Sequence, residues 1–432
     1  MDATPWLSRP TASGARDKFI PVRKEDILSV LIKQGEFADG AETEMFRRFA
    51  RTLRTICHYE YSETLDRLRD DYYYFNPEAA GSAAADPTTK DCAYVDLIRS
   101  LDKILKDANF EELPHENVAD DHRRRMVPVE VRVKQKDFRE VRFYGRGRHV
   151  EELEGSEWLG LRRRKAEIEA FDDVVLLVAI KTHAEIASWR ELRILKRRKI
   201  VPGSVLLKYF RNIACGDLYA LFPNARVVMS DFDKAVLGVP AIAGGIPIML
   251  KLYATISVLF LVVGIYLGGS GSIADPEMKT ALAALTGIVG LGAFAMRQWL
   301  KYQRQSLRYH MELADNIYYR NVNNNSGIFD YLIGAAEDQE CKQALLAYHF
   351  IRKAQPAPTI AEVAAHIEAW LAAGFGIKRD FEIAASLRTL ERLGLVWREA
   401  ERLYVPPLDQ AIGKLHQVWT NLFERQQTVE GQ

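Results

Sequence analysis

Histidine and carboxylate side chains gather at one place where they could ligate a metal ion. His115 is followed by Asp120, Asp121 and His122, and imidazole and carboxylate groups this close together can hold zinc. An acidic loop exposed to water explains the same composition more simply, and we favour it. The chain has no Walker A, HExxH, GxSxG or paired CxxC sequence. We therefore predict no catalytic residue, no metal and no cofactor, and an enzyme is not favoured.

A second candidate is the sequence GRGRH at residues 145–149, which joins two glycines to two arginines. Glycine lets neighbouring backbone N–H groups point to one centre and arginine adds positive charge, so the segment could bind an anion. A hairpin turn rich in arginine is the alternative, and it is the interpretation that we prefer.

Three basic clusters lie at residues 123–125, 161–165 and 195–199. If they share one face beside a bilayer they would attract anionic lipid, and otherwise they form an ordinary solvated surface. The formal net charge of the whole chain is only +1. A nucleic-acid partner is therefore not expected.

Two apolar runs, residues 252–268 and 280–296, carry no charged residue. As helices, seventeen residues rise ~25 Å, close to the ~30 Å hydrocarbon core of a bilayer. Because a short polar segment joins them, we predict a transmembrane hairpin over 252–300, reached through an apolar segment at 238–251. A pair of buried helices is the alternative. Small side chains at Ala283, Gly287 and Gly290 would permit close helix packing.

Charges beside the hairpin predict its orientation. Four basic residues and no acidic one follow the second run, whereas the connecting loop holds Asp275 and Glu277. Basic flanks remain on the cytoplasmic side. The N-terminus has no apolar signal core, and the four cysteines lie far apart, as in a reducing compartment. We predict a bacterial inner (cytoplasmic) membrane protein with both termini in the cytoplasm, or an organellar inner membrane protein.

Hydrophobic periodicity divides the rest of the chain. Alternating residues and a buried run at 174–181 predict strands in the middle domain, with a charged helix near 156–170 and two short strands around Pro202 and Gly203. The predicted regions are a disordered N-terminus (1–16), a helical region (17–126), an α+β middle domain (127–237), a helix that continues from the hairpin (301–325), a winged-helix-like domain (337–406), and a C-terminal helix and tail (407–432).

The continuing helix carries an apolar seam spaced by sevens and fours. It consists of Leu300, Leu307, Met311, Ala314 and Tyr318. The seam could pair with a second copy of the chain, giving a homo-oligomer, or pack on the middle domain.

The C-terminal region shows the order helix, helix, helix, hairpin, which is typical of a winged helix. Thr359 and Glu362 form a capping-box pattern at the second helix. The third helix exposes chiefly Arg388 and Arg392, and nearby acidic residues balance this charge. We therefore expect it to contact an unidentified protein rather than DNA.

Residues 205–245 resemble the core motif of the domain of unknown function 3754 family, which includes transmembrane protein 143. The matching positions are Lys208, Tyr209, Phe210, Ile213, Asp217, Leu218, Pro223, Asn224, Asp231, Gly238 and Pro240. Ala214 and Phe222 depart from the pattern, and residues 17–32 also look like the opening of the family. The resemblance implies a two-span membrane protein with no established activity and no known catalytic residues.

Together these observations predict an α+β membrane protein with a helical N-terminal region, a mixed middle domain, a two-helix hairpin and a winged-helix-like domain. We interpret the motif residues as coupling the middle domain to the hairpin, with Asp217 capping a helix or accepting from Lys208. The expected function is a membrane-anchored scaffold or regulatory protein that contacts the bilayer and another protein. An oligomeric channel or transporter component is the alternative.

Overall fold

The chain forms two compact units in the computed structural model. The structure describes residues 18–34, 37, 39–79, 87–113, 130–157, 162–186, 188–197, 200–228, 263 and 275–430. The main unit combines residues 1–126, 135–218 and 320–432, and the second unit combines 127–134 and 219–319. The main unit is thus assembled from three separate stretches of sequence.

Three helices open the main unit: α1 (Lys24–Gln34), α2 (Gly40–Tyr73) and α3 (Pro87–Asp107). Asp39 caps α2, because its side chain accepts a hydrogen bond from the Glu42 backbone N–H at 2.7 Å. Apolar residues at spacings of three and four form the buried face of α2. One of them, Phe49, stacks its ring on Tyr348 at 4.2 Å between centroids.

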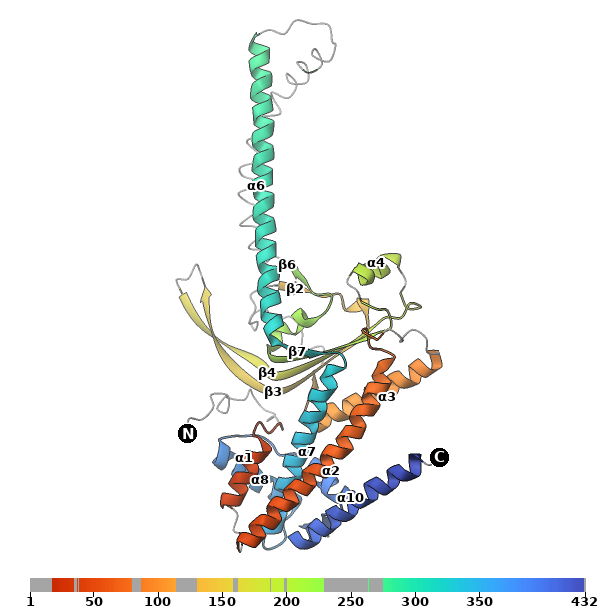
Figure 1. Ribbon diagram of the computed structural model, residues 1–432. Helices are drawn as coiled ribbons and strands as arrows, with labels where there is room; N and C mark the ends of the chain where they lie inside the picture. Colours follow the sequence, from red (N-terminus) through yellow and green to blue (C-terminus); the bar gives the residue numbers. More distant parts are fainter. Residues whose placement is uncertain are drawn as a thin grey trace. The chain divides into compact units, whose positions relative to one another are not determined.

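A five-stranded antiparallel sheet follows, in the order β1-β3-β4-β5-β7. Its strands are β1 (Glu111–Leu113), β3 (Phe138–Glu157), β4 (Arg162–Ile180), β5 (Val205–Ala214) and β7 (Asn321–Asn324). Residues 174–180 of β4 are at most 2% exposed, so the prediction of a strand buried on both faces is confirmed. In Figure 1, α2, α3 and α7 lie on one side of this sheet.

Three local predictions for the middle domain are wrong. The charged helix near 156–170 is replaced by strand, because residues 162–170 pair along their length with β3, Glu157 opposite Arg162 and Glu154 opposite Lys165. The first of the two short strands is instead α4 (Trp189–Arg197). GRGRH is no hairpin turn, because it lies inside β3.

The C-terminal part of the main unit contains α7 (Gly327–Lys353), α8 (Ile360–Phe375), α9 (Ile383–Arg392), β8 (Trp397–Glu399), β9 (Arg402–Tyr404) and α10 (Leu408–Glu430). The predicted capping box at Thr359 and Glu362 is confirmed, with both of its hydrogen bonds formed. Thr359 also bridges Arg402 of β9.

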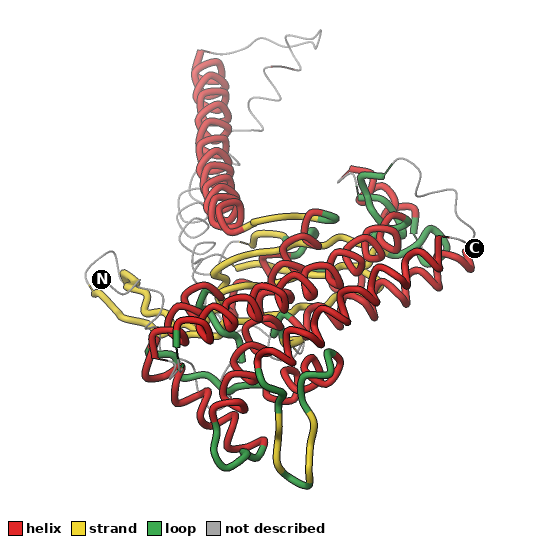
Figure 2. Tube along the Cα trace, turned by 60° about the horizontal axis from the view of Figure 1, so that its bottom comes forward, coloured by secondary structure: helices red, strands yellow, loops and turns green. Residues whose placement is uncertain are grey.

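Helix α7 joins the two hydrophobic cores of the main unit. Its first half packs with α2, α3 and the sheet, and its second half packs with α1, α2 and α8 to α10. Figure 2 shows the helices running across the strands. Because α2 also contributes residues to both cores, α2 and α7 together tie the sheet to the C-terminal helices.

The second unit contains β2 (Glu130–Arg132), which pairs with β6 (Arg226–Val228), and most of α6 (Asp275–Arg320). Along the sequence, the short 3₁₀ segment η2 (Gln135–Asp137) follows β2. A second one, η3 (Cys215–Leu221), precedes β6. The helix predicted over 301–325 ends at Arg320, five residues before the end of that range.

The prediction of a transmembrane hairpin is wrong. Across the described stretches, no helix combines the length and the apolar character needed to cross a bilayer. The second apolar run is not a separate helix but one part of the 46-residue α6, which continues through Arg297 and Lys301. The first run and segment 238–251 lie outside the described residues, apart from Val263. The predicted membrane fold class and the predicted integral-membrane localisation depend on this hairpin, so they are wrong as well.

Candidate functional site

In the described part of the main unit, the motif residues predicted from the sequence lie on a strand and on the 3₁₀ segment that follows it. Lys208, Tyr209 and Phe210 lie on β5, and Asp217 and Leu218 lie in η3. Burial raises the pKa of Tyr209, with Asp173 adding to the shift, and burial lowers the pKa of Lys208. Tyr209 and Phe210 are buried in the sheet, Lys208 is half-buried there, and Asp217 and Leu218 are buried in η3.

The remaining predicted residues belong to the second unit. Pro223 and Asn224 form the turn before β6, and the Asn224 side chain donates to the Lys134 carbonyl at 2.8 Å. Gly238 and Pro240 lie outside the described residues. Ala283, Gly287 and Gly290 lie on α6. Coupling between the middle domain and the following segment therefore stays a prediction.

A polar cleft of about 420 Å³ opens in the main unit between α2, α3, α7 and α9. Each helix supplies charged side chains to its lining: Glu60 and Arg67 from α2, Lys103, Lys106 and Asp107 from α3, Glu340 from α7, and Arg388 and Arg392 from α9. Both charge signs therefore meet in one small volume.

One side of the cleft is a closed ionic network around Arg392. Its guanidinium contacts the Glu60 carboxylate and donates to Glu340 Oε1 at 2.7 Å. The Thr389 hydroxyl donates to the same oxygen at 2.7 Å. Burial raises the pKa of Glu60, and Arg392 opposes this shift. Arg392 thus holds two carboxylates that would otherwise repel each other.

The other side of the cleft carries basic side chains that are not paired with carboxylates in the described part of the chain. Lys103, Lys106 and Arg388 are exposed at the cleft, and among the residues that the structure describes none of them forms an ion pair. Their common neighbour is Asp107, whose carboxylate feels the positive charge of all three. These three cations form the positively charged edge of a cleft whose lining holds five basic and five acidic residues in total.

Asp107 itself is an unusual carboxylate. Burial raises its pKa to about 6, Glu340 adds to the shift, and the three cations oppose it. A carboxyl group that titrates near neutral pH inside a cleft is a frequent mark of a functional site. Asp107 can accept a hydrogen bond when ionised and donate one when protonated.

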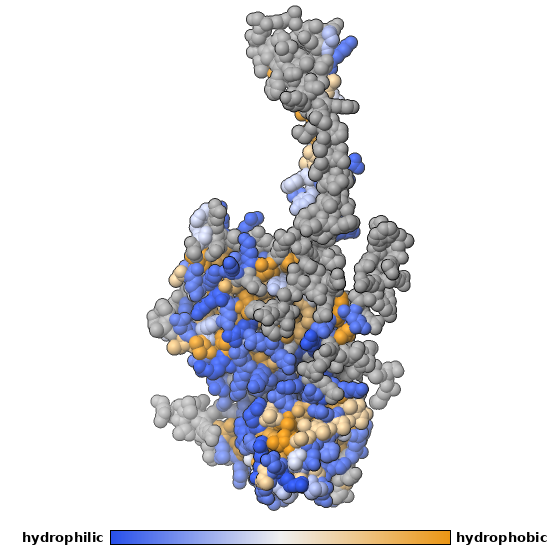
Figure 3. Space-filling view, turned by 180° about the vertical axis from the view of Figure 1, so that it is seen from behind, coloured by the Kyte–Doolittle hydropathy of each residue, from blue (hydrophilic) through white to orange (hydrophobic). Residues whose placement is uncertain are grey.

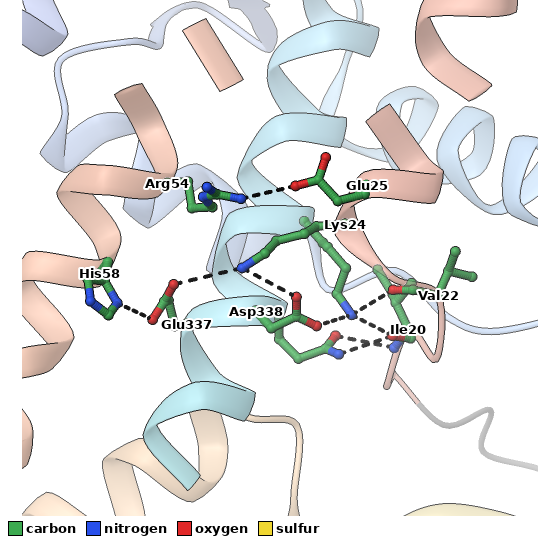
Figure 4. Close-up of polar contacts among 10 residues, drawn as sticks. Ile20, Val22, Lys24, Glu25, Arg54, His58, Glu337 and Asp338 are labelled. Atoms are coloured by element: carbon green, nitrogen blue, oxygen red, sulfur yellow. Dashed lines mark hydrogen bonds and ion pairs between the residues drawn. The ribbon is translucent and has the colours of Figure 1, made fainter. Parts of the chain in front are cut away.

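Beside the cleft, residues 18–22 are held against α7 (Figure 4). Lys342, 2% exposed, donates from Nζ to the carbonyls of Ile20 and Val22 at 2.8 and 3.0 Å and pairs with Asp338 at 2.7 Å. On the outer side of the same contact, Glu337 accepts from His58 at 2.9 Å. This docking carries Lys18 to within 3.2 Å of Glu382, a residue of the cleft lining.

A second buried ion pair completes the contact of the N-terminal segment with the sheet. Arg146, from the GRGRH sequence, bonds Asp173 at 2.8 Å and lies between the rings of Phe19 and Phe110. Gly147 has φ of +72°, and the space of a Cβ atom there is filled by Asp172. The GRGRH residues therefore make structural contacts in β3 and do not form the anion-binding loop considered from the sequence.

Sequence reasoning missed the cleft. It singled out Arg388 and Arg392 as the exposed face of a winged-helix third helix, but their neighbours Glu60 and Asp107 lie about 280 or more residues earlier. Arg388 and Arg392 lie four apart, a spacing that marks one helical face and could have indicated a site.

Residues 171–327 match the model of a family described as protein of unknown function, DUF3754. This confirms the resemblance drawn from residues 205–245. The match includes part of the sheet and α6 but none of the residues that line the cleft. No solved structure matches the chain.

Proposed function

We propose that this chain, with the DUF3754 match over residues 171–327, is a regulatory protein that binds a small anionic ligand in its polar cleft. The observation that carries the proposal is the contrast between two sides of one cavity. Arg392 forms ion pairs with two carboxylates. Lys103, Lys106 and Arg388 line the same cleft without an ion pair among the described residues.

The ligand would carry a phosphate or carboxylate group together with a hydroxyl or amine. Its anionic group would accept charge-assisted hydrogen bonds from the three cations. Asp107, at the same edge, would accept from its hydroxyl or amine. A volume of about 420 Å³ suits a small metabolite rather than a polymer.

The position of the cleft supports a regulatory role. Its lining comes from α2 and α7, which belong to both cores, and from α3 and α9, which belong to one core each. A ligand held by α3 and α9 together would favour the arrangement in which these helices lie close, and it can shift an equilibrium only through such a difference in affinity.

Two functions considered from the sequence are treated differently. Thr389 and Arg392 of α9 are engaged with Glu340 and Glu60, which supports the expectation that this helix does not read nucleic acid. The channel alternative depended on a membrane-spanning hairpin and is not carried forward.

Isothermal titration calorimetry of the full chain with inorganic pyrophosphate and with citrate tests the proposal. We expect saturable binding of at least one anion. Lys103→Gln and Arg388→Gln should each weaken it about five- to tenfold, corresponding to ~1–1.4 kcal/mol per charge-assisted hydrogen bond. The matched control is Lys33→Gln, an exposed lysine of α1 outside the cleft. Absence of binding by both anions, or equal weakening in the control, contradicts the proposal.

A further inference from the structure

One face of α6 carries a heptad pattern that two arginines interrupt. From residue 283 to residue 318, the residues of this face follow one another at alternating spacings of three and four, as the a and d positions of a coiled coil do. Two of the eleven positions are arginine, Arg297 and Arg304, and the other nine are small or apolar: Ala283, Thr286, Gly290, Ala293, Leu300, Leu307, Met311, Ala314 and Tyr318. We call these eleven residues the α6 seam. It joins Ala283 and Gly290 to the Leu-Met-Tyr stripe, which the sequence presented as separate features, and Gly287 lies outside it.

Every residue of the α6 seam is exposed. The large side chains remain 43% (Leu300), 60% (Leu307), 58% (Met311) and 75% (Tyr318) accessible. At Gly290, an added Cβ would meet no atom within 4 Å.

The charges beside the seam are complementary to a second copy. His310 precedes the seam residue Met311, and Asp315 follows the seam residue Ala314, so they flank opposite sides of the seam at g and e positions. Five residues apart, they cannot reach each other on one helix, where only neighbours at three or four residues meet. In a parallel pair of helices, a g residue lies beside the e residue five positions later on the partner. His310 of each copy would then lie beside Asp315 of the other.

We propose that α6 pairs in parallel with α6 of a second copy of this chain along the α6 seam. Ala283 and Gly290 let the backbones approach closely at one end, and Leu300, Leu307 and Met311 interlock beyond them. The pairing does not involve the polar cleft, so it stands or fails independently of the proposed ligand. It gives the chain the two-fold symmetry of a homodimeric scaffold.

Sedimentation velocity of the full chain over a concentration series tests the pairing. We expect a dimer that Leu307→Glu and Met311→Glu each weaken at least about tenfold, because a charge would enter the interface. Tyr302→Glu is the matched control, since Tyr302 is exposed on α6 at an f position away from the seam. A wild-type monomer at all concentrations, or equal weakening by the control, overturns the proposal.

A charge exchange tests the parallel arrangement. His310→Glu should weaken the dimer by placing like charges beside Asp315 of the other copy, and adding Asp315→Lys should restore it. Because positions 310 and 315 do not contact each other on one helix, this recovery reports a contact between copies. Failure of the double variant to recover overturns the parallel pairing.

Discussion

The side chain of Gln339 exchanges two hydrogen bonds with the backbone of Ile20. Its Oε1 accepts from the Ile20 N–H at 3.2 Å, and its Nε2 donates to the Ile20 carbonyl at 3.1 Å. An amide side chain on α7 thus pairs with an extended N-terminal segment as a neighbouring strand would. Both residues are 1% exposed, so water does not replace these bonds.

Gln339→Ala should therefore destabilise the protein. The Ile20 N–H would lose its partner while buried, and such a loss costs ~1–3 kcal/mol. The Ile20 carbonyl would keep its bond from Lys342. Urea denaturation measures the change, with the exposed Gln410→Ala on α10 as control. Equal midpoints for both variants would show that the docking contributes nothing.

The buried pair of Arg146 and Asp173 predicts a non-additive double variant. Arg146→Met should cost ~3–5 kcal/mol, because it leaves a carboxylate that is 6% exposed without its main partner. Asp173→Asn alone should also destabilise. In the double variant part of the loss should return, since no buried charge is stranded. Denaturation of the four proteins completes the cycle, and strict additivity would refute the coupling.

Asp107 predicts how stability changes with pH. Its folded-state pKa of about 6 lies above the ordinary value of 3.8, so the folded state binds this proton more tightly. Its contribution to the free energy of unfolding is fully present below pH 3.8 and is lost as pH rises through 6. Asp107→Asn should therefore stabilise the protein at pH 7, by at most ~3 kcal/mol, and change little at pH 4. The exposed Asp91→Asn on α3 is the control.

The same carboxyl should govern the affinity for anions. Below pH 6 it becomes neutral, and Lys103, Lys106 and Arg388 then act on an anion without the opposing charge of Asp107. Citrate or pyrophosphate binding should tighten as pH falls from 7 to 5.5, after correction for protonation of the ligand. Asp107→Asn should bind more tightly at pH 7 and lose most of this dependence. An unchanged profile in the variant would place the binding elsewhere.

The capping box offers a smaller, local prediction. Thr359→Ala removes the side-chain oxygen that accepts from the Glu362 N–H at 3.3 Å. The expected cost is ~1 kcal/mol, typical of an N-cap. Thr359→Ser keeps the oxygen and should be nearly neutral, and thermal unfolding distinguishes the two. Equal losses would mean that packing, not capping, sets the effect.

Local patterns predicted the elements whose partners are close in sequence. The buried run of β4 and the capping box of α8 both rest on spacing within a few residues. The charged residues 162–170 look helical by composition. They form strand because β3 supplies backbone partners along their whole length, which no local pattern reveals.

The candidate site was not predictable for the same reason. Asp107 and Arg388 are 281 residues apart, and only the packing of α3, α7 and α9 brings them to one cleft. The two apolar runs led to a wrong prediction. Their lack of charge predicts a membrane hairpin, but a single helix carries residues 280–296 onward into a charged stretch.

The ring contact between Phe49 and Tyr348 sets a condition on how this protein is made. The two residues are separated by 299 positions, so the core around α2 cannot close until α7 has left the ribosome. At ~5–20 residues per second, Phe49 and its apolar neighbours wait roughly 15–60 s for their partner. During biosynthesis the apolar faces of the N-terminal helices thus stay exposed for this time, and a chain interrupted before residue 348 would leave them exposed.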